Sequence, residues 1–186
     1  MRQGKSRGVK VTCEVCPHHF TLTDEMLAAP VPYDTNTKMN PPLRSADDVA
    51  AMKEGLRDGT IDAIATDHAP HSFDEKEVEY VYAPFGIVGL ETALGLAVTE
   101  LVRPGLLTLG QLVEKFSTNP RRILGLPEVR LAVGEAANLT IFDAAAEWTV
   151  DIQAFRSKSK NSPFHGARLV GRPSAILNHG TFVRCP

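Results

Sequence analysis

The chain has 186 residues, enough for one domain or slightly more, and 43% of them are hydrophobic, which is enough for a sizeable core. Charged residues make up 23% and the formal net charge is −2, which excludes the basic field that nucleic acid or an anionic membrane needs. No apolar stretch approaches the roughly 20 residues of a membrane span. Three cysteines are too few, and odd in number, for a disulfide framework, so we expect a cytoplasmic protein.

The first part of the chain predicts a helix end, a strand and a long loop. Residues 1–8 are polar and lead into a glycine turn, and Val9–Cys16 alternates apolar and polar residues with the period of a strand. The order suggests a chain that begins in the middle of an α/β repeat. Residues 30–44 are rich in proline and asparagine, and a long, stiffened loop inside a compact domain is usually functional.

Cys13 and Cys16 form a CxxC pair within this predicted strand. Residues three apart on a strand point to opposite faces, so the two thiols are poorly placed to share a metal ion. The sequence holds no second CxxC to complete a zinc site, and a redox CxxC belongs at a helix start. We expect small core residues here, and metal or redox use is the alternative.

A helix and a buried strand follow, and the strand ends at polar residues. Ser45–Asp48 resembles a capping box and predicts a helix start. Ile61–Thr66 is apolar nearly throughout, as in a parallel strand that is covered on both faces. Because chemistry on parallel sheets lies at the carboxyl ends of strands, Asp67 is a candidate active-site acid. The alternative is a plain polar turn in which Asp67 caps a helix.

The next stretch predicts an exposed excursion, a tight turn and helices. Residues 72–82 are acidic and predict the exposed excursion, which could act as a lid. Ala83–Gly89 predicts an apolar turn whose backbone a ligand could approach, or simply a turn at a helix start. A strongly apolar helix is expected from Leu90 to Val102. Thr108 is expected to cap a second helix, and Asn119-Pro120 to begin a third.

Beyond Pro127 the pattern changes to short strands. Residues 129–143 predict a turn that feeds a strand, and residues 151–166 are polar and loop-like. Further strands are expected at residues 147–150, 167–170, 174–177 and 181–184, the last two joined by a hairpin turn at residues 178–180. We therefore divide the chain into an α/β part, residues 1–127, and an all-β part, residues 128–186.

Four motifs occur together in the order and spacing of the dihydroorotases, which are cyclic amidohydrolases. The motifs are Cys16–Phe20, Lys38–Arg44, Thr66–His71 and Pro84–Thr92. Gly134–Asp143 also looks like the return of an amidohydrolase chain to its small β-domain. The resemblance covers essentially the whole chain. Lys38–Arg44 and Thr66–His71 resemble dihydroorotase more than hydantoinase or allantoinase.

The resemblance implies a (β/α)₈ barrel that carries a divalent metal centre, normally zinc. This chain would be its carboxyl-terminal part, with the last barrel strands and helices and a small all-β tail domain. The implied reaction is the reversible hydrolysis of dihydroorotate to N-carbamoyl-L-aspartate in de novo pyrimidine biosynthesis. Implied partners are this substrate and either a homo-oligomer or aspartate carbamoyltransferase.

The resemblance also implies roles for single residues. Asp67 would be a metal ligand and the catalytic proton shuttle. The substrate-binding residues would be Asn40, His71, Phe85 and Gly86, with His71 facing the substrate carboxylate. The remaining histidines would be structural, supporting or surface residues, namely His18, His19, His68, His165 and His179.

Dihydroorotase requires further metal ligands from barrel strands that come before the two strands expected here. They are not found in this sequence. They are an HxH pair, a bridging carboxylate or modified lysine, and two later histidines, and one carboxylate cannot hold a catalytic zinc. We therefore expect a carboxyl-terminal fragment that is inactive alone. Three alternatives stay open: another cyclic amidohydrolase such as dihydropyrimidinase or allantoinase, a non-catalytic subunit that scaffolds aspartate carbamoyltransferase, and an unrelated β-rich binding module.

Overall fold

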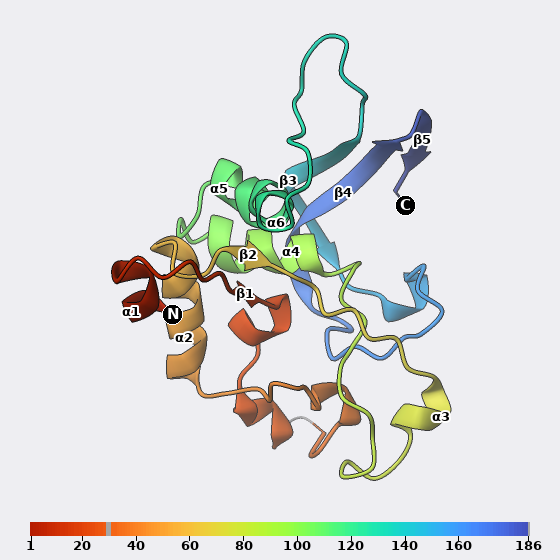
Figure 1. Ribbon diagram of the computed structural model, residues 1–186. Coiled ribbons are helices and arrows are strands. Elements are labelled where there is room, and N and C mark those ends of the chain that lie inside the picture. The colour runs from red at the N-terminus through yellow and green to blue at the C-terminus, as the bar shows by residue number, and fades with distance from the viewer. Residues whose placement is uncertain (29–30, 186) are drawn as a thin grey trace.

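The computed structural model describes residues 1–28 and 31–185, so Pro30 of the predicted loop and Pro186 of the predicted β part lie outside it. The helical segments at residues 93–118 lie between a small parallel sheet and a larger antiparallel sheet, and the helix at residues 46–57 lies away from the antiparallel sheet (Figure 1). The first elements along the chain are α1 (Arg2–Ser6), β1 (Glu14–Val15), η1 (Pro17–Phe20), η2 (Asp24–Leu27), η3 (Thr35–Thr37), α2 (Ala46–Arg57), β2 (Ala63–Ile64), α3 (Phe73–Lys76) and α4 (Ala93–Ala97). They continue with η4 (Val98–Val102), α5 (Leu109–Val113), η5 (Glu114–Thr118), α6 (Asn119–Ile123), β3 (Leu139–Thr149), η6 (Ile152–Ala154), β4 (Arg168–Asn178) and β5 (Thr181–Arg184).

The strands β1 and β2 pair in parallel, with Glu14 opposite Ala63 and Val15 opposite Ile64. The predicted parallel arrangement is confirmed, but the predicted lengths, Val9–Cys16 and Ile61–Thr66, are wrong. At its start the ladder is replaced by a side-chain hydrogen bond, in which the Asp62 carboxylate accepts from the Cys13 N–H at 2.9 Å. Lys5 Nζ donates to the same carboxylate at 2.6 Å, which ties α1 to the strand.

The helix α2 begins as its sequence predicts. Ser45 Oγ accepts from the Asp48 N–H, and the Asp48 carboxylate accepts from the Ser45 N–H, each at 3.3 Å. This reciprocal capping box satisfies two amides that the first helical turn leaves free. Leu56 is buried on the inner face of the helix. The helix lies in the chain between β1 and β2.

The central helical segments differ from their predicted bounds. The apolar helix begins at Ala93, not Leu90, and widens into the π turn η4. Gly89 lies before this helix, and its carbonyl accepts from the Ala93 N–H at 3.2 Å. A Cβ at Gly89 would come within 2.8 Å of the Thr66 carbonyl oxygen, so the Asp67 segment approaches closely here. The predicted helix start at Asn119 is confirmed as the first residue of α6, but α6 is not a separate helix. The backbone is helical through Thr118, so α5, η5 and α6 form one run, and Pro120 follows a widened π turn.

The strands β3, β4 and β5 form an antiparallel sheet in that order. Predicted strands 147–150, 167–170 and 174–177 are not separate, because β3 and β4 each pass through a register shift without ending. Gly171 in β4 has a φ of +93° and packs on Val98. The predicted hairpin is confirmed, with Asn178 opposite Thr181.

Residues 151–166 are not simply an exposed loop. Phe155 and Phe164 are buried, and they pack with Met39, Ile87 and Leu169 in one hydrophobic cluster. Apolar contacts therefore connect the two predicted parts of the chain. The division at residue 127 stays a prediction, and residues 126–138 extend away from the body as a loop (Figure 1).

A second hydrophobic cluster lies beneath the parallel strands. Its members come from β1, η1, α2, β2, α4, η4 and α5 and include Phe20, Leu56, Ile64, Leu101 and Leu112. By packing β1 and β2 against the helices, this cluster sets the direction in which the carboxyl ends of the two strands point. None of the helices in residues 1–28 and 31–185 is long and apolar enough to cross a membrane.

Truncating Leu101 to alanine should lower the free energy of unfolding by about 2–5 kcal/mol, because its side chain is fully buried and would leave a cavity. The matched variant Leu124→Ala removes a side chain that is 71% exposed and should change stability by less than about 0.5 kcal/mol. Urea unfolding followed by circular dichroism measures both. Equal losses would contradict the placement of Leu101 in the core.

Candidate active site

The candidate site lies where β1 and β2 end. Asp67 follows β2 with a φ of +47°, a left-handed conformation that residues other than glycine rarely adopt and that is common at functional sites. Its exposed side chain lines a cavity of about 550 Å³ together with Cys16, His19 and Pro41. The structure thus places Asp67 at a strand end that opens to solvent, as its sequence position predicts.

Two irregular segments lie side by side at the site. We call Thr66–His71 the Asp67 loop and Ala83–Gly89 the Phe85 loop. The Ala69 N–H donates to the Ile87 carbonyl at 2.8 Å. The Gly89 N–H donates to His68 Nδ1 at 3.1 Å, so the proton of this imidazole is on Nε2. His68 therefore holds the two loops together.

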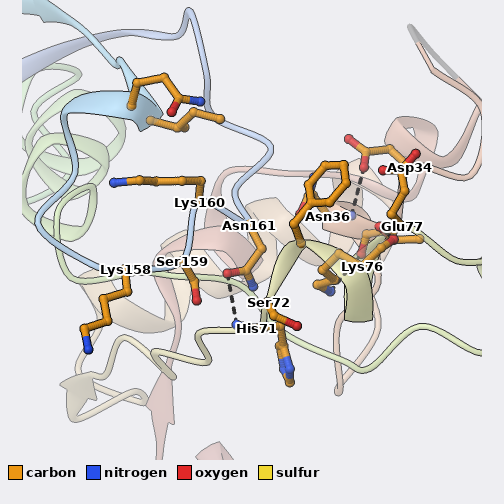
Figure 2. Close-up of a pocket in the computed structure, with 14 residues that line it drawn as sticks. Asp34, Asn36, His71, Ser72, Lys76, Glu77, Lys158, Ser159, Lys160 and Asn161 are labelled. Carbon is orange, nitrogen blue, oxygen red and sulfur yellow. Dashed lines mark hydrogen bonds between the residues drawn. The ribbon is translucent and has the colours of Figure 1, made fainter.

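His71 lies beside the Phe85 loop and lines a second pocket, of about 670 Å³ (Figure 2). Its Nε2 donates to the Phe85 carbonyl at 3.0 Å, since a carbonyl can only accept. Its Nδ1 lies 3.7 Å from a carboxylate oxygen of Glu75. The structure therefore joins His71 and Phe85 directly, whereas Asp67 lines the other cavity.

Gly86 sits where no larger residue fits. Its φ is +98°, and a Cβ there would come within 2.6 Å of the Ala69 Cβ. Its N–H donates to the Lys38 carbonyl at 2.8 Å, which attaches the Phe85 loop to Lys38–Arg44, the Asn40 loop. Lys38 Nζ donates to the Ala83 carbonyl at 2.7 Å and lies 4.8 Å from the centre of the Phe85 ring.

Asn40 itself is exposed, and its neighbour Pro41 lines the cavity of Asp67. The Asn40 loop thus reaches both groups of predicted site residues: it contacts Gly86 through Lys38 and borders Asp67 through Pro41. The five predicted residues therefore lie along one set of connected loops, but only Asp67 and His71 line a cavity, and each lines a different one.

Asn161 is a supporting residue that the sequence analysis missed. Its side-chain amide donates to the Ala69 carbonyl at 2.9 Å and to the Gly86 carbonyl at 3.3 Å. Its Oδ1 accepts from the His71 N–H at 3.2 Å, a bond drawn in Figure 2. Asn161 is buried, so it connects the Asp67 and Phe85 loops without water. It lies in the segment predicted as a plain loop, and no local pattern marks it.

Lys76 is a second missed residue and corrects the prediction that residues 72–82 are wholly exposed. It is buried at the end of α3 because its Nζ donates to the Thr35 carbonyl at 3.1 Å and to the Pro84 carbonyl at 2.8 Å. Burial lowers the pKa of Lys76 from 10.5 to about 8. The acidic excursion is thus anchored at one point to both neighbouring segments.

Cys16, His18 and His19 converge at the end of β1. Their ligand atoms, one per residue, all lie within 4.8 Å of one another. Burial, with the nearby charges of Asp67 and Glu14, raises the pKa of the Cys16 thiol to about 12. Burial and the neighbouring His19 lower the pKa of His18 to about 3, so this imidazole is neutral. Cys16 is half-buried rather than a core residue.

The chain belongs to the Amidohydrolase family, whose model matches residues 7–168. A protein named dihydroorotase from Pelotomaculum thermopropionicum is 57% identical over 183 residues, which are 98% of this chain and 42% of that protein. The chain thus spans less than half the length of the curated relatives it matches.

Solved structures of related enzymes share this fold. L-Hydantoinase (dihydropyrimidinase) from Arthrobacter aurescens is 34% identical with a TM-score of 0.86, and the match covers 98% of this chain and 41% of that one. Dihydropyrimidinase from Brevibacillus agri is 24% identical with a TM-score of 0.89 and the same coverage. The expected membership of the cyclic amidohydrolases is thereby confirmed at the level of family and fold.

The contribution of Lys76 to stability should rise between pH 8 and about 10.5. Its folded pKa is lowered, so the unfolded chain binds more protons in this window and folding becomes more favourable as pH increases. The free energy of unfolding of wild type minus that of Lys76→Met should therefore increase over this range in urea titrations. The exposed control Lys158→Met should show no such trend, and a flat difference for Lys76 would contradict the burial of its charge.

Proposed function

We propose that this chain supplies the last two strands of a (β/α)₈ barrel and a following β segment of a dihydroorotase. The proposed reaction is the reversible hydrolysis of dihydroorotate to N-carbamoyl-L-aspartate. The observation that carries the proposal is the position of Asp67, held in a left-handed conformation at the open carboxyl end of β2. The 57% identity to a protein named dihydroorotase supports the choice of substrate.

In this proposal Asp67 is the proton-transferring group. A carboxylate beside the scissile bond can accept a proton from the attacking water and return it to the leaving ring nitrogen. Asp67 is exposed in its cavity and therefore accessible to both partners in the transfer. Its left-handed backbone costs about 1–3 kcal/mol, which the surrounding loops must offset.

The proposed substrate-binding residues are Asn40, His71, Phe85 and Gly86. The hydrogen bond to the Phe85 carbonyl leaves Nδ1 of His71 for a charged partner, and a substrate carboxylate would have to take the place of the Glu75 carboxylate, which lies 3.7 Å from it. In its protonated form His71 can donate to a substrate carboxylate. Phe85 and Gly86 would border the ring through a backbone that is held rigid by Lys38 and Asn161.

Zinc belongs to this proposal only as a property of the complete barrel. A catalytic zinc takes three protein ligands and a water, and among the described residues Asp67 is the only ligand that the resemblance implies. The implied donor set therefore does not fit a zinc ion within this chain, and the roles above are those of its own side chains.

The partners and the location are also part of the proposal. A homo-oligomer or a complex with aspartate carbamoyltransferase is what the resemblance implies. A cytoplasmic location is supported by three cysteines that are all unpaired. The alternative function is that of a dihydropyrimidinase or hydantoinase, which the similarity to the Arthrobacter aurescens enzyme favours.

Joining this chain to the remaining part of the Pelotomaculum thermopropionicum dihydroorotase should give an enzyme that hydrolyses dihydroorotate in the presence of zinc. Asp67→Asn should lower kcat by about 10²–10⁴-fold, because the amide cannot accept the proton. The exposed control Asp74→Asn should keep full activity. The loss of ultraviolet absorbance of dihydroorotate measures the rates.

The 186-residue chain alone should give no turnover in the same zinc-supplemented assay. Turnover by the isolated chain would refute the proposal that its site needs further barrel strands. Faster hydrolysis of dihydrouracil or hydantoin than of dihydroorotate by the joined protein would favour the alternative function instead.

His71→Ala in the joined protein should raise KM for dihydroorotate by about tenfold or more with a smaller change in kcat. The reason is the loss of a charge-assisted hydrogen bond, worth roughly 1.5–3 kcal/mol, to a substrate carboxylate. His165→Ala changes an exposed histidine of the β segment and serves as the control. An unchanged KM for the His71 variant would remove it from the substrate site.

A further inference from the structure

The residues at the end of β1 bring three metal-binding side chains together without help from the Asp67 loop. Cys16 precedes η1 in an extended conformation, and Pro17 starts the tight turn that carries His18 and His19. The imidazole rings of His18 and His19 lie with their centres 4.2 Å apart. The fold therefore places one thiol and two imidazoles, all from residues 16–19, with their ligand atoms within 4.8 Å of one another.

The hydrogen bonds around the cluster leave lone pairs available. His19 Nε2 donates to the Pro41 carbonyl at 2.8 Å, so in the neutral ring the lone pair on Nδ1 is the one available to a metal ion. Metal-binding histidines commonly donate their other ring N–H to a backbone carbonyl in this way. Within the described part of the chain, neither the Cys16 sulfur nor the His18 ring has a hydrogen-bond partner. A donor set without competing partners is suited to ligation.

The spacing is close to that of a bound ion. Bond lengths of about 2.3 Å to sulfur and 2.0–2.1 Å to nitrogen put the ligand atoms of a tetrahedral zinc site roughly 3.5 Å apart. Small side-chain rotations would therefore draw atoms within 4.8 Å onto one ion. One sulfur with two nitrogens suits a borderline-soft cation such as Zn²⁺ or Co²⁺ and not Mg²⁺ or Ca²⁺, which prefer oxygen.

An access route is present, because Cys16 and His19 line the cavity of about 550 Å³ that also holds Asp67. We propose that Cys16, His18 and His19 form a site for Zn²⁺ or a similar divalent cation, with its fourth coordination position open to this cavity. Binding replaces the proton of the Cys16 thiol by the metal, and the proton passes to solvent. This site uses none of the ligands that the resemblance implies, and it does not rest on the proposed function.

Cobalt provides a direct spectroscopic test in the 186-residue chain. Titration of the reduced, metal-free chain with Co²⁺ should produce a near-ultraviolet thiolate-to-cobalt charge-transfer band at a ratio of one ion per chain, and Zn²⁺ should displace it. Cys16→Ser should abolish the band. His18→Gln and His19→Gln should each weaken Co²⁺ binding by at least about tenfold, which is the scale seen even for residues that only support a ligand.

Matched variants test whether the band depends on these three side chains. Cys13→Ser changes a thiol of the same segment that donates to the Thr60 carbonyl, and Cys185→Ser changes the remaining thiol, and both variants should keep the band. Asp67→Asn should also keep it. Absence of the band in wild type, its persistence in Cys16→Ser, or its loss in Cys13→Ser would overturn the proposal. Equal Co²⁺ affinity of the urea-unfolded chain would overturn it too, because sequence spacing alone would then suffice.

Discussion

The candidate site depends on the need of irregular backbone to find hydrogen-bond partners. The Asp67 loop and the Phe85 loop run side by side without forming a sheet, and their partly buried amides and carbonyls cannot all pair with each other. Side chains from distant segments complete them. Asn161 serves the carbonyls of Ala69 and Gly86, and Lys76 serves that of Pro84. Without these hydrogen bonds the two loops would not be held in a single conformation.

The carboxyl ends of the two parallel strands carry two kinds of metal-binding donor group, and for this reason we place the candidate site there. Asp67 follows β2, while Cys16, His18 and His19 follow β1. Asp67, Cys16 and His19 line one cavity, and His18 is buried beside it. A carboxylate and a thiol with two imidazoles differ in the cations that they prefer. A site assembled from adjacent strand ends can therefore hold donors that the family's own pattern does not use, because strand geometry brings together whatever side chains occupy those positions.

Local signals in the sequence were sufficient where the physics is local. Ser45 formed its predicted capping box, Thr108 capped its helix as predicted, and the turn at His179-Gly180 formed its predicted hairpin. Strand lengths were overestimated, since the alternation in Val9–Cys16 could not reveal that Asp62 would bind the Cys13 amide. Asn161 and Lys76 carried no local signal, because their partners are distant in the sequence. Asn161 binds Ala69, which is 92 residues away, and Lys76 binds Thr35, which is 41 residues away.

The sequence by itself determined the capped helix starts at Ser45 and Thr108, the parallel order of β1 and β2, and the placement of Asp67 at a strand end. It also carried the resemblance to the cyclic amidohydrolases, because four short motifs in fixed order are a property of the chain and not of its packing. Only the tertiary structure decided which side chains hold the loops and that Cys16, His18 and His19 converge. Those arrangements depend on contacts between distant segments and on a tight turn after β1, and the period of a strand alone cannot predict them.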